Sequence, residues 1–256
     1  MTTHARPAPA SLSASVPAPA RTGPPAGAQA VGRALDVLLC FHDNGPDPTA
    51  SDLARRLGLS TSTAHRLART LLAAGFLEQD ARTARYRLGP AVTELGRISY
   101  HQRGLHLAAP ELRDLAARTG TTAALALRSG AHAVIVAGET VVPKAGLRRP
   151  LRSTAPGKVL LAWPGDGEPS SPIGESALVR DRGHVLEDED PCPGVRTLAV
   201  PVLDRSGSAR FALAVRAAPA ELSGARLGRL LPQVQACARA LEVLLLPPGE
   251  RRAPEA

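Results

Sequence analysis

Two short stretches of this chain combine small hydroxyl groups with basic side chains. The first contains Ser60, Thr61, Ser62, Thr63, His65, Arg66 and Arg69, and the second contains Arg82, Thr83 and Arg85. Short hydroxyls permit close approach to a surface, and a guanidinium can bind a guanine edge or a phosphate. Unpaired amides at the start of a helix also accept phosphate oxygens. The chemistry that these residue types predict is recognition of a polyanion.

The flanking pattern places the first stretch at the start of a helix. Apolar residues recur at helical spacing from Ala64 to Leu71, so we expect a helix from Thr61 to Ala74 with Ser60 as its N-cap. A shorter helix precedes it, and we expect Ser51 to cap that helix and Gly58 to end it. The turn between them is short enough to set the two helices steeply across each other.

The second stretch falls in an expected hairpin of two strands, residues 76–79 and 85–88, joined by a polar turn. Helix, short helix, tight turn, helix and hairpin is the order of a winged helix-turn-helix, and we assign it to residues 30–89. The second helix of the pair would then enter the major groove by its N-terminal end. Hairpin residues would contact the minor groove or flanking phosphates.

Each piece also has a purely structural interpretation. A helix pair with a glycine turn is often simple packing, Ser60 can be only a cap, and Arg66 and Arg69 can be solvated surface residues. The charge favours DNA, since the net charge is +8 and residues 1–103 hold 12 Arg against 7 acidic residues. Aromatic residues are only 2% of the chain, which argues against binding single strands by base stacking.

The remaining residues divide into four parts. Residues 1–29 lack large apolar side chains and are expected to be a disordered tail. Residues 90–104 are expected to form a linker helix, residues 105–247 an α+β domain, and residues 248–256 a second tail. The sequence has neither an apolar run of eighteen residues nor a signal pattern, so we expect a cytoplasmic protein without a membrane partner.

Catalytic and metal-binding motifs are missing from the sequence. It has neither GxSxG nor HExxH, and Cys40, Cys192 and Cys237 are too far apart for a metal knuckle. The acidic run 187–190 lacks EF-hand spacing and is expected to be a solvated turn. We therefore expect no cofactor and no metal. An enzyme with an accessory DNA-binding domain and an architectural DNA binder remain as alternative functions.

Ordered motifs in both halves resemble the IclR family of bacterial transcription regulators. In the N-terminal half these are TASDLARRLGLS at 49–60, TSTAHRL at 61–67, GFLEQD at 75–80 and YRLGP at 86–90. In the C-terminal half they are LRSTAPGKVLLA at 151–162, RGHVLEDED at 182–190 and GVRTLAVPV at 194–202. The resemblance implies a winged helix-turn-helix domain, a linker helix and a GAF-like α+β effector-binding domain. It also implies a repressor that binds a near-palindromic operator in double-stranded DNA as a homodimer or homotetramer.

The resemblance further implies a pocket for a small-molecule effector. Its residues would be Ala155, Pro156, Gly157, Glu187, Thr197, Ala214 and Arg216. Ala214 and Arg216 stand where relatives often have hydroxyls, so Arg216 either binds an anionic effector or points outward. The segment 163–179 is short, which suggests that a helix over the pocket is missing. A DNA binder with a degenerate effector domain is the alternative.

Overall fold

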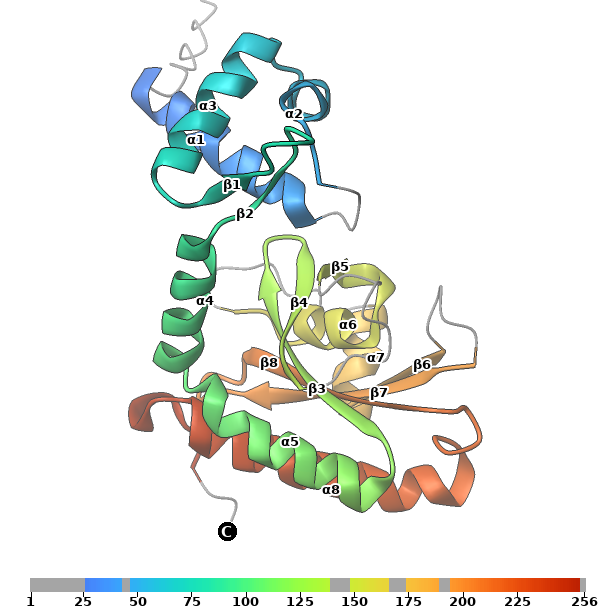
Figure 1. Cartoon of the computed structure of the whole chain (residues 1–256). Helices are drawn as coiled ribbons and strands as arrows, with labels where there is room; N and C mark the ends of the chain where they lie inside the picture. Colours follow the sequence, from blue (N-terminus) through green and yellow to red (C-terminus); the bar gives the residue numbers. More distant parts are fainter. Residues whose placement is uncertain (1–25, 43–46, 139–147, 166–173, 189–193, 254–256) are drawn as a thin grey trace, which may run out of the picture.

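A computed structural model describes residues 26–42, 47–138, 148–165, 174–188 and 194–253 of the chain. In this structure a small N-terminal head and a larger C-terminal domain are joined by a single helix, α4 (Figure 1). The head contains α1 (Ala26–Leu39), the 3-10 turn η1 (Cys40–His42), α2 (Ala50–Leu57), α3 (Thr61–Ala73), β1 (Leu77–Gln79) and β2 (Tyr86–Leu88).

The start of α2 differs from expectation. Thr49, not Ser51, is the N-cap, and it forms a capping box with Asp52. The Asp52 carboxylate accepts the backbone N–H of Thr49 at 3.0 Å, while the Thr49 hydroxyl accepts the N–H of Asp52 at 3.2 Å. The two bonds satisfy orphan donors at the helix start. The backbone N–H and the hydroxyl of Thr49 both donate to the Asp52 carboxylate and, together with Arg55, lower the pKa of Asp52 to about 2.

The head is organised by one apolar core with the wing packed onto it. Val37, Leu53, Leu77 and Tyr86 are at most 1% exposed and bring together α1, α2 and both wing strands. The backbone N–H of Tyr86 also donates to Pro48 O at 2.8 Å, which ties β2 to the segment before α2. The position of α3 and of the wing relative to each other is therefore fixed by the core.

The connecting helix α4 (Pro90–Gln102) begins with proline at its first turn, where a missing N–H costs nothing. None of its residues is buried. It ends before Gly104, which adopts a φ of 66° and starts α5 (Leu105–Thr119) in a new direction. The head is therefore joined to the C-terminal domain by a helix that has no buried residue.

The C-terminal domain is built on one antiparallel sheet in the order β5-β4-β3-β8-β7-β6. Its strands are β3 (Thr122–Ser129), β4 (His132–Gly138), β5 (Arg148–Pro150), β6 (Val185–Asp188), β7 (Arg196–Leu203) and β8 (Ala209–Ala217). Helices α5 and α8 (Gly224–Leu245) cover one face, and α6 (Ala155–Ala162) and α7 (Glu175–Arg182) lie on the other (Figure 1). Two 3-10 turns, η2 (Leu151–Ser153) and η3 (Pro248–Glu250), complete the domain.

Side chains alternate between the two faces of this sheet, as strand geometry requires. Leu198, Val200, Leu213 and Val215 pack under α5 and α8 in the larger core. Small residues such as Ala199, Ala212 and Ala214 face α6 and α7. The small side chains let the short helix α6 lie close to the strands.

Three expectations about the chain need correction. The tail does not extend to residue 29, because α1 begins at Ala26; residues 1–25 lie outside the described part. A helix is present in the segment thought to lack one, since α7 starts at Glu175. The described part of the acidic run is the end of strand β6, where Glu187 pairs with Lys158 and Asp188 with Arg196, so it is not a solvated turn.

Within the described residues, we find no helix that combines the length and the apolar character needed to cross a bilayer.

Candidate nucleic-acid interface

Helix α3 buries one side and leaves the other open. Ala64, Leu67, Ala68 and Leu71 pack into the head core at 8% exposure or less. The predicted DNA-contacting residues lie on the open side or at the amino end; Ser60, Thr61, Ser62, His65, Arg66 and Arg69 are exposed, and Thr63 is half-buried. The amino end of α3 therefore presents hydroxyls, an imidazole and two guanidiniums to solvent.

Ser60 has the capping role that its position predicts. Its hydroxyl accepts the N–H of Thr63 at 3.3 Å and lies 2.8 Å from the Thr63 hydroxyl and 3.1 Å from the Ser62 hydroxyl. Gly58 closes α2 with a φ of 63°, a left-handed conformation that suits glycine. The turn thus places a cluster of three hydroxyls at the N-terminus of α3, where the helix dipole favours an anion.

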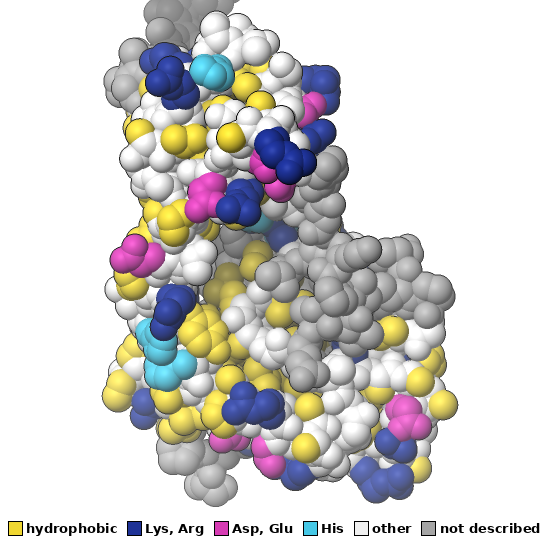
Figure 2. Space-filling model, in the orientation of Figure 1, with side chains coloured by type: hydrophobic (Ala, Val, Ile, Leu, Met, Phe, Trp, Pro, Cys, Tyr) yellow, Lys and Arg dark blue, Asp and Glu magenta, His cyan; other side chains and the backbone are white. Residues whose placement is uncertain are grey.

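The arginines of the head fall into two groups. Arg55 pairs with Asp52 at 2.7 Å, Arg56 donates to Cys40 O at 3.2 Å, and Arg87 pairs with Glu78 at 2.6 Å. In contrast, no hydrogen bond or ion pair within the described part of the chain engages the guanidiniums of Arg66, Arg69 and Arg82, all of them exposed. Basic side chains are visible on the surface of the head, above the linker helix, in Figure 2.

The wing turn is held by Asp80. Its carboxylate accepts the backbone N–H groups of Arg82 and Thr83, both at 2.8 Å, and the two bonds lower the pKa of Asp80. Ala84 follows in a left-handed conformation with a φ of 54°, which is unusual for a residue with a side chain. The turn therefore has a defined shape that projects Arg82 and Thr83 outward.

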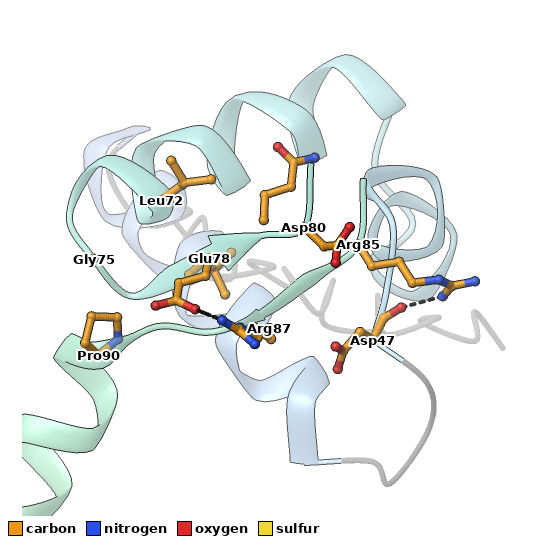
Figure 3. Close-up of a pocket in the computed structure, with 10 residues that line it drawn as sticks. Asp47, Leu72, Gly75, Glu78, Asp80, Arg85, Arg87 and Pro90 are labelled. Atoms are coloured by element: carbon orange, nitrogen blue, oxygen red, sulfur yellow. Dashed lines mark hydrogen bonds and ion pairs between the residues drawn. The ribbon is translucent and has the colours of Figure 1, made fainter. Parts of the chain in front are cut away.

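Arg85 is placed differently from the other predicted wing residues. Its Nη1 donates to the carbonyl oxygen of Asp47 at 2.5 Å, and both residues line a cleft of about 680 Å³ that is also lined by the wing and the end of α3 (Figure 3). Figure 3 also shows Arg87 bound to Glu78 on the neighbouring strand. Nη1 of the Arg85 guanidinium is thus hydrogen-bonded within the head.

Comparisons with known proteins agree with this architecture. Residues 30–81 match the IclR helix-turn-helix domain, and residues 174–243 match the C-terminal domain of the bacterial transcriptional regulator IclR. The chain is 31% identical over 257 residues to the HTH-type transcriptional regulator BhcR of Paracoccus denitrificans, covering 88% of this chain and 91% of BhcR. The chain belongs to the IclR family. It is therefore a DNA-binding transcriptional regulator.

Two further proteins similar to this IclR-family regulator each match more than four-fifths of the chain. The HTH-type transcriptional regulator XynR of Escherichia coli is 29% identical over 240 residues, covering 83% of this chain and 95% of XynR. A solved IclR homologue of Microbacterium hydrocarbonoxydans, complexed with 4-hydroxybenzoate, superposes with a TM-score of 0.66 at 24% identity. That match covers 84% of this chain and 98% of the homologue.

The regulator's predicted effector residues come together on the α6 side of the sheet. Glu187 on β6 is the register partner of Thr197 on β7, and Thr197 is the partner of Arg216 on β8. Residues paired across strands share a face, and two positions along β8 from Arg216 lies Ala214, which packs toward α6. Thr197 and Ala214 are at most 1% exposed, whereas Arg216 is half-buried.

Three of the predicted effector residues lie in one helical turn. Ala155, Pro156 and Gly157 are the first turn of α6, capped by the Thr154 hydroxyl, which accepts the N–H of Gly157 at 3.2 Å. All three are buried. A β-carbon on Gly157 would lie 2.1 Å from Leu151 O, so only glycine permits this close approach to η2.

Lys158 connects α6 to its neighbours. It pairs with Glu175 of α7 at 2.8 Å and with Glu187 of β6. Burial alone would lower the pKa of Lys158, but the two carboxylates outweigh it and the pKa is raised. Glu187 thus serves an ion pair that holds α6 and α7 to the sheet edge.

Sequence reasoning missed two groups. The Thr49–Asp52 capping box has a readable T-x-x-D signal directly before an apolar run, but Ser51 was chosen instead. Thr122 on β3 faces Arg216 across the strand pair, and its hydroxyl is buried without a hydrogen-bond partner among the described residues. The position of Thr122 opposite Arg216 depends on strand register, which no local sequence pattern reveals.

Proposed function

We propose that this IclR-family regulator binds a near-palindromic operator as a dimer, with α3 of each head in the major groove. The observation that carries the proposal is the open amino end of α3, where the exposed guanidiniums of Arg66 and Arg69 lie together with exposed hydroxyls. Two-fold protein symmetry would match the operator symmetry. We further propose that the protein acts in the cytoplasm, that it represses transcription, and that neither domain is an enzyme.

Each predicted residue has a proposed contact. Arg66 would bind a base edge or phosphate within the groove, and Arg69, lower on the exposed side, would contact the backbone. The hydroxyls of Thr61, Ser62 and Thr63 and the imidazole of His65 would line the groove face of the helix. The wing residues Arg82 and Thr83 would reach flanking phosphates, with Arg85 contributing less because it already binds Asp47.

The direct test measures binding of fluorescent DNA from upstream of the regulator's own gene by anisotropy at two salt concentrations. Arg66→Ala is expected to weaken binding by about 1–3 kcal/mol, roughly 5- to 150-fold, at unchanged thermal stability. Arg113→Ala, an exposed arginine of α5, is the matched control and should bind like wild type. Equal loss in both variants would indicate only general charge, and no loss would contradict the role of Arg66.

The proposed dimer is supported by an exposed apolar stripe on α1. Val31, Leu35 and Leu39 recur every four residues and are 62%, 55% and 51% exposed. Such a stripe on a helix is suited to a second copy of the same surface. Leu35→Glu is expected to shift the protein to monomer in sedimentation equilibrium, while Leu178→Glu, at 60% exposure on α7, should not. A Leu35→Glu variant that remains dimeric would contradict this interface.

The α6 face is the proposed effector site, with a small carboxylate as the ligand class. It is supported by Arg216, whose guanidinium suits a carboxylate, and by the adjacent hydroxyls of Thr197 and Thr122. The solved homologue complexed with 4-hydroxybenzoate adds that a member of this fold binds such an anion. Binding there would alter operator affinity by moving α4. The change in the free energy of operator binding can only equal the difference in the effector's affinity for the two positions of α4.

A thermal-shift titration with 4-hydroxybenzoate tests the site. Wild type is expected to be stabilised in a saturable way, and Arg216→Gln should lose the shift. Arg152→Gln, at an exposed position on the nearby turn η2, should retain it. Retention of the full shift by Arg216→Gln would contradict the site. Absence of any ligand effect on DNA binding would instead favour a constitutive architectural binder.

A further inference from the structure

A separate cleft of about 620 Å³ lies at the foot of the linker helix. Four parts of the fold meet there, namely the end of α4, the ends of β3 and β8, the later part of α6 and the segment after α8. The lining residues that matter for the argument are Arg103, Leu127, Arg128, Leu160, Arg210 and Phe211. Apolar side chains gather where the linker helix meets the C-terminal domain in Figure 2.

Two of its arginines belong to neighbouring strands. Arg128 lies on β3 and Arg210 on β8, beyond the pair Ala126–Ala212 at which the pairing of the two strands ends. Arg210 is partly balanced, since its Nη1 lies 3.4 Å from Glu250 and 3.8 Å from Asp204. Among the described residues that line the cleft, three are arginines and one, Glu250, is a carboxylate; Arg128 also donates its Nε to Gly130 O at 3.0 Å.

The third arginine comes from the linker itself. Arg103 is the C-cap of α4, and its guanidinium is exposed with no hydrogen bond or ion pair to any part of the chain that the structure describes. It faces the cleft together with Gln102. The guanidinium of Arg103, at the end of α4, therefore lines the same cleft as Arg128 and Arg210.

The cleft also has an apolar wall. Leu160, Phe211 and Leu246 line it and are 2%, 6% and 4% exposed, so they are anchored in the domain cores. A pocket of this size with an apolar wall and a few convergent charged groups is typical of a small-molecule site. The ligand that suits it has a flat apolar body and one anionic group.

We propose that this cleft is a second ligand site of the regulator, for an aromatic carboxylate, separate from the α6 face. The carboxylate lies between Arg103 and the strand-end arginines, and the ring packs against Phe211 and Leu127. Because Arg103 ends α4, an occupied cleft fixes the foot of the linker helix to the C-terminal domain. The site thereby gives a second route by which a metabolite changes the position of the head.

Equilibrium dialysis of the full chain without DNA tests the proposal, with 2-naphthoate as the probe. Wild type is expected to show a saturable site that Arg103→Gln weakens at least ten-fold, because one charge-assisted contact is removed. Arg97→Gln, on the same exposed helix but outside this cleft, is the matched control and should bind like wild type. Arg216→Gln should also retain this site, which separates it from the proposed effector face.

Four outcomes overturn the proposal. The first is that 2-naphthoate shows no saturable binding, and the second is that the neutral 2-naphthylmethanol binds equally well. The third is that Arg97→Gln and Arg103→Gln weaken binding equally, and the fourth is that Arg216→Gln alone abolishes all binding. Since the assay contains no DNA, a failure of operator binding does not affect it. Circular dichroism of Arg103→Gln is expected to match wild type, since the side chain is exposed and makes no hydrogen bond or ion pair within the described residues.

Discussion

Replacement of Tyr86 by phenylalanine is expected to stabilise the head. The ring is completely buried between β2 and the helices, and its hydroxyl has no hydrogen-bond partner among the described residues. Burial also raises the pKa of Tyr86. A buried hydroxyl without a partner costs about 1–3 kcal/mol, whereas the phenylalanine ring keeps the packing and the backbone bond to Pro48 O. We expect a gain of about 1 kcal/mol.

Hydrogen exchange of head amides measures this gain, because slow-exchanging amides of α3 report the opening free energy of the head. Tyr86→Phe should slow their exchange about five-fold, which corresponds to about 1 kcal/mol. Tyr100→Phe, half-buried at the end of the linker helix, should leave them unchanged. Exchange that becomes faster in Tyr86→Phe would refute the reasoning, since it would mean that the hydroxyl is satisfied in solution.

Three further results are expected. Asp52→Asn should be less stable than wild type at pH 7, and the difference should close as the pH falls from about 4 towards 2, because the pKa of Asp52 is lowered to about 2 in the folded protein; acid titrations followed by circular dichroism measure this. Glu242→Ala should lower the free energy of unfolding in urea by about 2–3 kcal/mol, since this buried carboxylate accepts three N–H groups. Glu221→Ala, which removes the solvent-accessible ion pair with Arg226, should lower it by under about 1 kcal/mol. Gly157→Ala should lower the melting temperature, because its β-carbon collides with η2, whereas Gly228→Ala, in open space on α8, should not.

The sequence predicted the DNA-binding head well because its signals are local. The apolar spacing of α3, the Ser60 cap and the Gly58 turn each depend on residues within a few positions, and all three are present in the structure. Ser51 was a wrong choice of cap because two hydroxyl residues stand two positions apart, and only the Asp52 side chain decides between them.

The C-terminal domain was harder to predict in detail. The pairing of Glu187 with Thr197 and of Thr197 with Arg216 depends on strand register, which tertiary packing sets. The cleft at the foot of α4 joins side chains more than a hundred positions apart, such as Arg103 and Arg210. Helix α7 was missed because its sequence, ESALVRDR, buries only one side chain, Val179. A helix with so small an apolar face gives little periodic signal.

Affinity cleavage from the amino end of α3 tests the central claim most directly. An iron chelate is attached to Ser62→Cys in a chain with Cys40 and Cys192 changed to serine; Cys237 stays, because burial raises its pKa to about 11 and leaves the thiol unreactive. The account predicts two clusters of cuts in the operator, separated by about 10 base pairs or a multiple of that spacing. Cuts spread evenly along the DNA, or no more frequent than those from a chelate at Arg113→Cys, would contradict it.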